Sequence, residues 1–154
     1  MRMETQFSVY LINKPGVLAA VTGALAREKV NIVALALMDS GEHGALRIVC
    51  DDAAAARTVL GRAHDRWTEC EVLAVELDHR PGAFARVAEE LAVHHINITY
   101  AYCTGGAGGG RVTAIFKISD LDKAQKVLVA LDSRLAGRKE SRVVKTPHGQ
   151  KDVH

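Results

Sequence analysis

The sequence has few of the features that mark secreted and membrane-spanning proteins. It contains three cysteines, Cys50, Cys70 and Cys103, an odd number whose spacing matches no metal-binding motif. We therefore expect reduced thiols in a cytoplasmic protein, because small secreted domains usually pair their cysteines. No apolar run approaches the roughly 20 residues that cross a bilayer, and the first residues lack the apolar stretch of a signal peptide.

The chain also lacks a strong charge of either sign. Lys and Arg number 20 against 18 acidic residues, which gives a net charge of +2. This bias is too small to suggest direct contact with nucleic acid. Hydrophobic residues make up 48% of the 154 residues and charged residues 25%, as is typical of a soluble globular protein. The length allows one ordinary domain or two very small ones.

The main positive feature is an internal duplication. Pro15-Gly16 recurs 66 residues later as Pro81-Gly82, and the same offset carries Asn31-Ile32 onto Asn97-Ile98. Apolar positions around these pairs follow the same offset, and a later block that begins at Asp52 recurs with an offset of 68. The sequence therefore predicts two similar domains and a polar tail, at residues 1–70, 71–145 and 146–154.

Each copy is predicted to run strand, helix, strand, strand, helix, strand. The strands show apolar alternation or continuous apolar runs, and the helices show apolar residues at helical spacing. In the first copy we expect strands at Thr5 to Ile12, Ile32 to Met38, Ala45 to Cys50 and Trp67 to Glu71, with helices beginning at Pro15 and at Asp52, the latter as an N-cap. The second copy is expected to open with a strand at Val72 to Leu77 and to close with one at Ser141 to Lys145.

This order predicts an α+β fold of two tandem ferredoxin-like βαββαβ units, with antiparallel sheets and both helices on one face. Ile32 to Met38 is apolar at every position, which indicates a strand covered on both faces. We therefore expect the two repeats to pack as one body that buries this strand and its counterpart, Ile98 to Cys103. Open strand edges and an apolar sheet face predict a homodimer.

At Asn13-Lys14-Pro15-Gly16-Val17-Leu18 the sequence resembles the ACT domain family, and Asp78-His79-Arg80-Pro81-Gly82-Ala83-Phe84 is similar to a second instance. The resemblance extends over both repeats and leaves only the tail outside. It implies a stand-alone tandem ACT protein without a catalytic domain. ACT domains are regulatory and bind small ligands, most often amino acids, at interfaces between two such units.

The backbone of the first loop suits a carboxylate. Proline at the first helical position lacks an N–H that would be unsatisfied there, and the amides of Gly16, Val17 and Leu18 have no partner inside the helix. Donors at the positive end of a helix dipole attract an anion. Gly16 lets a ligand approach the backbone, and the Asn13 amide can accept from an ammonium group. The alternative is that Asn13 only caps the helix and Pro15-Gly16 only shapes a turn.

The second loop departs from this pattern, because His79 stands where Asn13 does and the acid Asp78 lies one position too early. Whether this loop binds an amino acid is therefore left open. The full set of candidate ligand-binding residues is Asn13, Pro15, Gly16, Val17, Leu18, Asn31, His79, Arg80, Gly82, Ala83, Phe84 and Asn97.

Other patterns favour structural roles. The glycine-rich run from Thr104 to Arg111 lies between two predicted strands and has no Lys-Ser or Lys-Thr end, which favours a hairpin over a phosphate loop. His94 and His95 are adjacent and cannot share a metal as residues spaced i, i+4 can. Tyr100 and Tyr102 share one sheet face and are expected to pack at an interface. No catalytic residue, metal or cofactor is predicted.

The sequence thus predicts a cytoplasmic regulatory protein that binds a free amino acid and transmits this to a partner, either a regulated enzyme or a transcription factor. The alternative is a transcription-linked regulator that acts through protein contacts, resembling in layout the tandem ACT repressor of the glycine cleavage system. An enzyme on the same sheet is a third hypothesis, disfavoured because no nucleophile, base and orienting group come together.

Overall fold

The computed structural model describes residues 1–64, 66–105 and 110–143, and the side chains of 39–40 and 138–143 lie outside this description as well. It confirms the α+β class. Among the described residues, no helix has both the length and the apolar character to span a bilayer. The elements in chain order are β1 (Arg2–Ile12), α1 (Val17–Arg27), β2 (Ile32–Ser40), β3 (His43–Cys50), α2 (Ala53–Ala63), β4 (Trp67–Asp78), α3 (Ala83–Val93), β5 (Ile98–Thr104), β6 (Arg111–Ile118) and α4 (Leu121–Val143).

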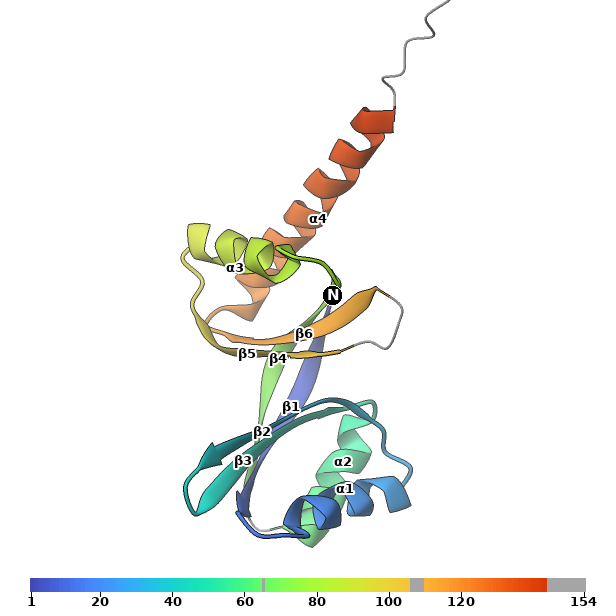
Figure 1. Ribbon diagram of the computed structural model, residues 1–154, viewed down its shortest axis with the longest axis vertical. Helices are drawn as coiled ribbons and strands as arrows, with labels where there is room; N and C mark the ends of the chain where they lie inside the picture. The colour runs from blue at the N-terminus through green and yellow to red at the C-terminus, as the bar shows by residue number, and fades with distance from the viewer. Residues whose placement is uncertain (65, 106–109, 144–154) are drawn as a thin grey trace, which may run out of the picture.

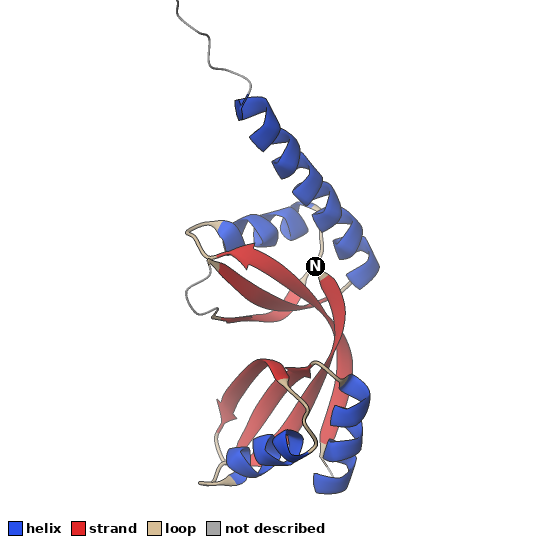
Figure 2. Cartoon of the chain, turned by 90° about the vertical axis from the view of Figure 1, so that its right-hand side faces the viewer, coloured by secondary structure: helices blue, strands red, loops and turns tan. Residues whose placement is uncertain are grey.

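All six strands belong to one antiparallel sheet with the order β2-β3-β1-β4-β6-β5. Figure 1 shows that this sheet folds into two halves, with β2, β3, α1 and α2 below and β5, β6, α3 and α4 above. The helices lie on the outer face of each half, and the helix-free faces of the two halves are turned toward each other (Figure 2). Each half has the predicted ferredoxin-like arrangement.

The two halves share their central strands. The first part of β4 pairs with β1, and its second part, from Leu73 to Asp78, pairs with β6. In return, Arg2 to Glu4 of β1 pair with Ala74 to Val72 and occupy the place of a fourth strand in the second half. Thr5 and Glu71 are register partners and lie 66 residues apart. The local twofold axis that relates the repeats therefore passes between them.

This exchange corrects two predictions. The expected strands at Trp67 to Glu71 and Val72 to Leu77 are one continuous strand, β4, and the division placed between residues 70 and 71 falls inside it. The expected last strand at Ser141 to Lys145 is wrong, because α4 continues to Val143 and β1 fills that place in the sheet. Residues 144–145, the tail 146–154 and residues 106–109 of the glycine-rich run lie outside the described residues.

Each half buries a core between its helices and its sheet. Val21 and Leu25 of α1 are fully buried, and their counterparts in α3, Val87 and Leu91, are buried in the same way. Asp52 caps α2 as predicted, since its carboxylate accepts a hydrogen bond of 2.9 Å from the Ala55 amide. The apolar stripes thus hold α1 and α3 against the sheet, and the cap fixes the start of α2.

A third core lies between the two helix-free faces. It consists of Ala34, Val49, Val72, Ala74 and Ile115, so the two repeats form one body as predicted. The expectation that Ile32 to Met38 is covered on both faces is wrong. β2 is an edge strand, and the side chains of Leu35, Leu37 and Met38 are 36%, 50% and 43% exposed. β5, at the other edge, is also only partly buried.

Gln6 fastens the two halves together. It is the one polar or charged residue that is fully buried in the described part of the chain. Its Nε2 donates to the Tyr100 hydroxyl at 2.6 Å, and its Oε1 accepts from the Tyr102 hydroxyl at 2.9 Å. Burial raises the pKa of both tyrosines, so both hydroxyls stay protonated. The expectation that the two rings share a face and pack at an interface is confirmed.

Arg47 adds a charged contact to this cluster. Its guanidinium lies 3.8 Å from the centroid of the Tyr100 ring, and its Nη1 donates to the Met38 sulfur at 3.1 Å. A cation over an aromatic face is attracted by the ring quadrupole. The contact therefore links β3 of the first half to β5 of the second.

Replacing Gln6 with Leu should lower the free energy of unfolding by about 1–3 kcal/mol, because two tyrosine hydroxyls lose their partner between the two halves of the sheet. The triple variant Gln6→Leu, Tyr100→Phe, Tyr102→Phe should recover most of this loss. Urea unfolding measures both effects. Tyr10→Phe, on an exposed tyrosine of the same strand, is the control, and a Gln6→Leu protein as stable as this control would contradict the assigned role.

Candidate functional site

The first candidate loop is a tight turn at the end of β1. Gly16 has φ 87° and ψ −16°, and the Val17 amide donates to the Lys14 carbonyl at 3.4 Å. This is a type II turn with proline and glycine in its two central positions. α1 therefore begins at Val17, so the expected start at Pro15 is two residues early, and the Val17 amide has a partner after all. The backbone amide of Asn13 donates to the Glu42 carbonyl at 3.0 Å, which fixes the loop beside the β2–β3 hairpin.

The second loop has the same backbone. Gly82 has φ 83° and ψ −7°, and the Ala83 amide donates to the Arg80 carbonyl at 3.3 Å. The His79 amide donates to the Gly110 carbonyl at 2.7 Å, as that of Asn13 does to Glu42. The two loops thus differ in side chains and not in geometry.

The helices that follow these loops are uncapped. In the described chain neither α1 nor α3 has a side-chain cap or an acidic residue in its first turn, whereas Asp52 caps α2 and Asp120 accepts from the Lys123 amide at 3.0 Å at the start of α4. The amides of Gly16 and Leu18 have no hydrogen-bond partner within the described residues. These donors and the helix dipole provide a place for an anionic group.

Asn13 is not the cap of α1. Its Nδ2 donates to the Gly41 carbonyl at 3.5 Å, which turns the side chain toward the β2–β3 hairpin. The alternative in which Asn13 only caps the helix is therefore wrong. Because the donor end of the amide is used, Oδ1 is the end that can accept from a ligand.

A hollow of about 190 Å³ opens beside the first loop. Its lining comes from the end of β1, the start of α1 and the β2–β3 hairpin, and consists of Leu11, Ile12, Asn13, Lys14, Val17, Leu18, Leu37, Met38 and Gly44. Of the candidates in the first loop, Asn13, Val17 and Leu18 line the hollow, while Pro15 and Gly16 shape the turn next to it. The sequence reasoning missed Leu11, Ile12 and Lys14, which are close to the motif in sequence. It also missed Leu37, Met38 and Gly44, since only the strand order brings the hairpin to this loop.

Sequence comparison places the chain in a family. The family described as ACT domain pair matches residues 2–142. The chain belongs to the ACT domain pair family. A search of curated proteins found no match.

Solved structures share the fold of this ACT domain pair. Protein BT0572 from Bacteroides thetaiotaomicron is 28% identical, covers 84% of this chain and 89% of its own, and has a TM-score of 0.78. The regulatory subunit of aspartate kinase from Thermus thermophilus is 14% identical over 86% of this chain and 97% of its own, with a TM-score of 0.61. Aspartate kinase from Synechocystis is 17% identical over 97% of this chain and 27% of its own, with a TM-score of 0.63.

The second ACT unit places its candidates differently. Phe84 stands where Leu18 does, and its ring stacks on Phe116 of β6 with centroids 5.2 Å apart and an interplanar angle of 24°. Arg80 and Ala83 line a larger hollow of about 920 Å³ on the helix side of this unit. His79 and Gly82 belong to the turn itself.

Asn31 and Asn97 lie away from both loops, because each follows the far end of a helix of 11 residues, about 16 Å long. The Asn31 amide donates to the Asp51 carboxylate at 2.9 Å, and the Asn97 amide donates to the Ser119 hydroxyl at 3.1 Å. The left-handed residues that end these helices are Lys29 and His95, with φ 59° and 56°, and not Asn31 and Asn97.

The cysteines of this ACT domain pair are free. Burial, with a smaller contribution from the Asp51 carboxylate, raises the pKa of Cys50 to about 11. Burial also raises the pKa of Cys103. Thiols with raised pKa values are poor nucleophiles at neutral pH. Among the described residues, no group of three His, Cys, Asp or Glu side chains is arranged to hold a metal ion.

Changing Gly16 or Gly82 to Ala should lower the free energy of unfolding by about 1–2 kcal/mol, the cost of a Cβ in the left-handed region. The added methyl would meet no atom within 4 Å at either position, so this cost comes from the backbone alone. The control is Gly23→Ala inside α1, where the new Cβ would lie 3.6 Å from Arg27 and stability should rise by about 0.5–1 kcal/mol. Equal effects of the three changes in urea unfolding would contradict the turn geometry.

Proposed function

We propose that this chain is a regulatory protein, and not an enzyme, that binds a free amino acid at the first loop and transmits this to a partner protein. The ACT domain pair is a regulatory module, and the uncapped start of α1 beside the hollow is the observation that supports binding here. The free cysteines support a reducing compartment, the cytoplasm.

The first hollow suits a zwitterion. The ligand carboxylate would accept from the amides of Gly16 and Leu18 at the positive end of α1, and the Asn13 Oδ1 would accept from its ammonium. Lys14, on the rim, adds a positive charge near the carboxylate. The rest of the lining is mostly apolar, and the hollow is smaller than the roughly 300–1,000 Å³ of a drug-sized site. We therefore propose an amino acid with a small apolar side chain.

The two loops should differ as ligand sites. His79 replaces Asn13, and Phe84, which stacks on Phe116, replaces Leu18, which lines the first hollow. In this proposal the first loop is therefore the stronger amino-acid site, and the second loop is the weaker one.

Calorimetry with the twenty amino acids, first on the parent protein and then on Asn13→Ala, tests the proposed site. Loss of the hydrogen bond to the ammonium should weaken binding by about 10- to 150-fold. Asn31→Ala is the matched control, because it removes the same side chain at the opposite end of α1, and its affinity should equal that of the parent. Unchanged binding in Asn13→Ala, or an equal loss in Asn31→Ala, would overturn the assignment.

We also propose that the chain forms a homodimer through the β2 edge. β2 ends the sheet and carries exposed Leu35, Leu37 and Met38, and Tyr10 and Ile12 of β1 are exposed as well. An open strand edge with apolar side chains pairs readily with another chain.

Light scattering at high micromolar concentration should give twice the 16.6 kDa mass of the chain. Leu35→Lys should shift the particle toward the single-chain mass, because a charge on an edge strand blocks pairing. Thr99→Lys on the opposite edge strand, β5, serves as the control and should leave the dimer intact. A parent protein of 16.6 kDa under these conditions would rule the dimer out.

A further inference from the structure

The larger hollow, of about 920 Å³, lies between the end of β4, the start of α3 and the middle of α4. We call it the α3–α4 groove. Its volume is that of a site for a small organic ligand. Its apolar lining is formed by Met1, Val75, Leu77, Ala83, Val87, Leu128, Leu131, Leu135 and Ala136.

The extra length of α4 builds one wall of this groove. α4 has 23 residues and α2 has 11, and with the offset of 68 the last residue of α2, Ala63, corresponds to Leu131. Asp132, Leu135 and Ala136 line the groove and belong to the part of α4 that has no counterpart in α2. Figures 1 and 2 show α4 running beyond the sheet, where α2 ends beside it.

The acidic groups beside β4 already have partners. The Glu76 carboxylate accepts from the Thr113 hydroxyl at 2.7 Å and lies 3.5 Å from Arg2. Asp78 lies 3.4 Å from the guanidinium of Arg80. Glu76 and Asp78 are therefore not the partners of the remaining arginines in the groove lining.

Two guanidinium groups of the groove are left for a ligand. Within residues 1–64, 66–105 and 110–143, neither Arg86 nor Arg111 forms an ion pair or a side-chain hydrogen bond. The lining holds three acidic residues and three arginines, and among its carboxylates only that of Asp132 is likewise without a partner in the described chain. In the first unit Ala20 and His43 stand at the positions of these arginines, so the fold itself does not require them.

We propose that the α3–α4 groove binds an organic anion with an apolar body, a hydrophobic carboxylate. Arg86 and Arg111 hold the carboxylate, since a guanidinium matches the geometry of two carboxylate oxygens. The apolar body lies along Leu128, Leu131 and Leu135 and is removed from water there. This site differs in chemistry and position from the amino-acid site at the first loop and does not depend on it.

Calorimetry with octanoate tests the proposal on the whole chain, with 1-octanol and octylammonium as probes of the same length. Octanoate should bind most tightly and octylammonium least. Arg86→Ala and Arg111→Ala should each weaken octanoate binding about tenfold, near the lower end for a charge-assisted hydrogen bond because both arginines are exposed. Arg86→Lys should retain part of the affinity.

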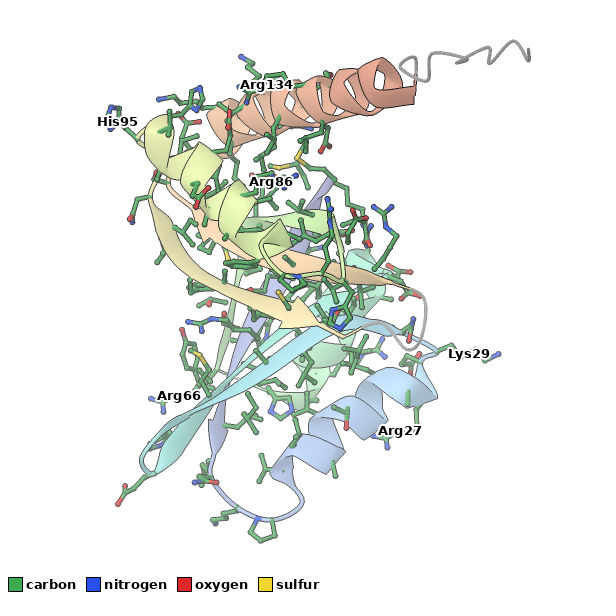
Figure 3. The ribbon with its side chains drawn as sticks, turned by 45° about the horizontal axis from the view of Figure 1, so that its top comes forward. Arg27, Lys29, Arg66, Arg86, His95 and Arg134 are labelled. Carbon is green, nitrogen blue, oxygen red and sulfur yellow. The ribbon has the colours of Figure 1, made fainter. Side chains whose placement is uncertain are left out.

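The matched control is Arg27→Ala. In Figure 3, Arg27 on α1 lies at the opposite end of the molecule from Arg86 and Arg134, so octanoate affinity should equal that of the parent. Leu135→Ser, which shortens the apolar wall in the extension of α4, should weaken octanoate and 1-octanol alike. Circular dichroism verifies that each variant folds.

Three results would overturn the proposal: no saturable octanoate binding, equal affinity in the parent and the Arg86→Ala, Arg111→Ala double variant, or tighter binding of octylammonium. Asn13→Ala separates this site from the first loop, since it should leave octanoate binding unchanged. Loss of octanoate binding in Asn13→Ala would place the octanoate at the first loop and refute the groove.

Discussion

The backbone pairing of β1 with β4 is the constraint on which the rest of the structure depends. Both strands are central in the sheet. β1 is the first strand of the first unit and β4 contains that of the second, and each also adds a fourth strand to the other unit. The two Pro-Gly loops follow the C-terminal ends of these strands and therefore lie at opposite ends of one antiparallel ribbon. Between them, Gln6 binds two tyrosines of β5, and Arg47 links Tyr100 to Met38 of the first hollow. A ligand that moved Met38 would thus disturb a contact between the two units.

The duplication made most elements predictable. The cap at Asp52, the apolar stripe of Val21 and Leu25 and the hairpin between β5 and β6 depend on neighbours in sequence, and the structure confirms them. The errors concern long-range pairing. Apolar runs do not distinguish an edge strand from a central one, so Ile32 to Met38 was expected to be buried. Nor can periodicity show that Arg2 to Glu4 would replace a strand expected more than 130 residues later.

The candidate site was predictable where a local motif determines the backbone. The Pro-Gly pairs indicated two turns before helices with open N-termini, and both are present. Leu37, Met38 and Gly44 come from a hairpin whose place beside the loop follows from the strand order alone. The backbone amides of Asn31 and Asn97 form equivalent turn contacts in the two copies, with Asp51 and with Ser119. Repetition within a chain thus marks shared architecture as readily as shared chemistry.

The exchange of strands also affects how such a chain is synthesised and can be rearranged. During translation Arg2 to Glu4 emerge first, but their partners at Val72 to Ala74 follow about 70 residues later, so the N-terminal segment stays unpaired until then. Contacts this distant in sequence require a long loop to close before they form, which slows folding. A gene cut between the repeats would leave each product with an unpaired sheet edge in place of its fourth strand, which favours aggregation. Each repeat therefore depends on the other copy to complete its sheet.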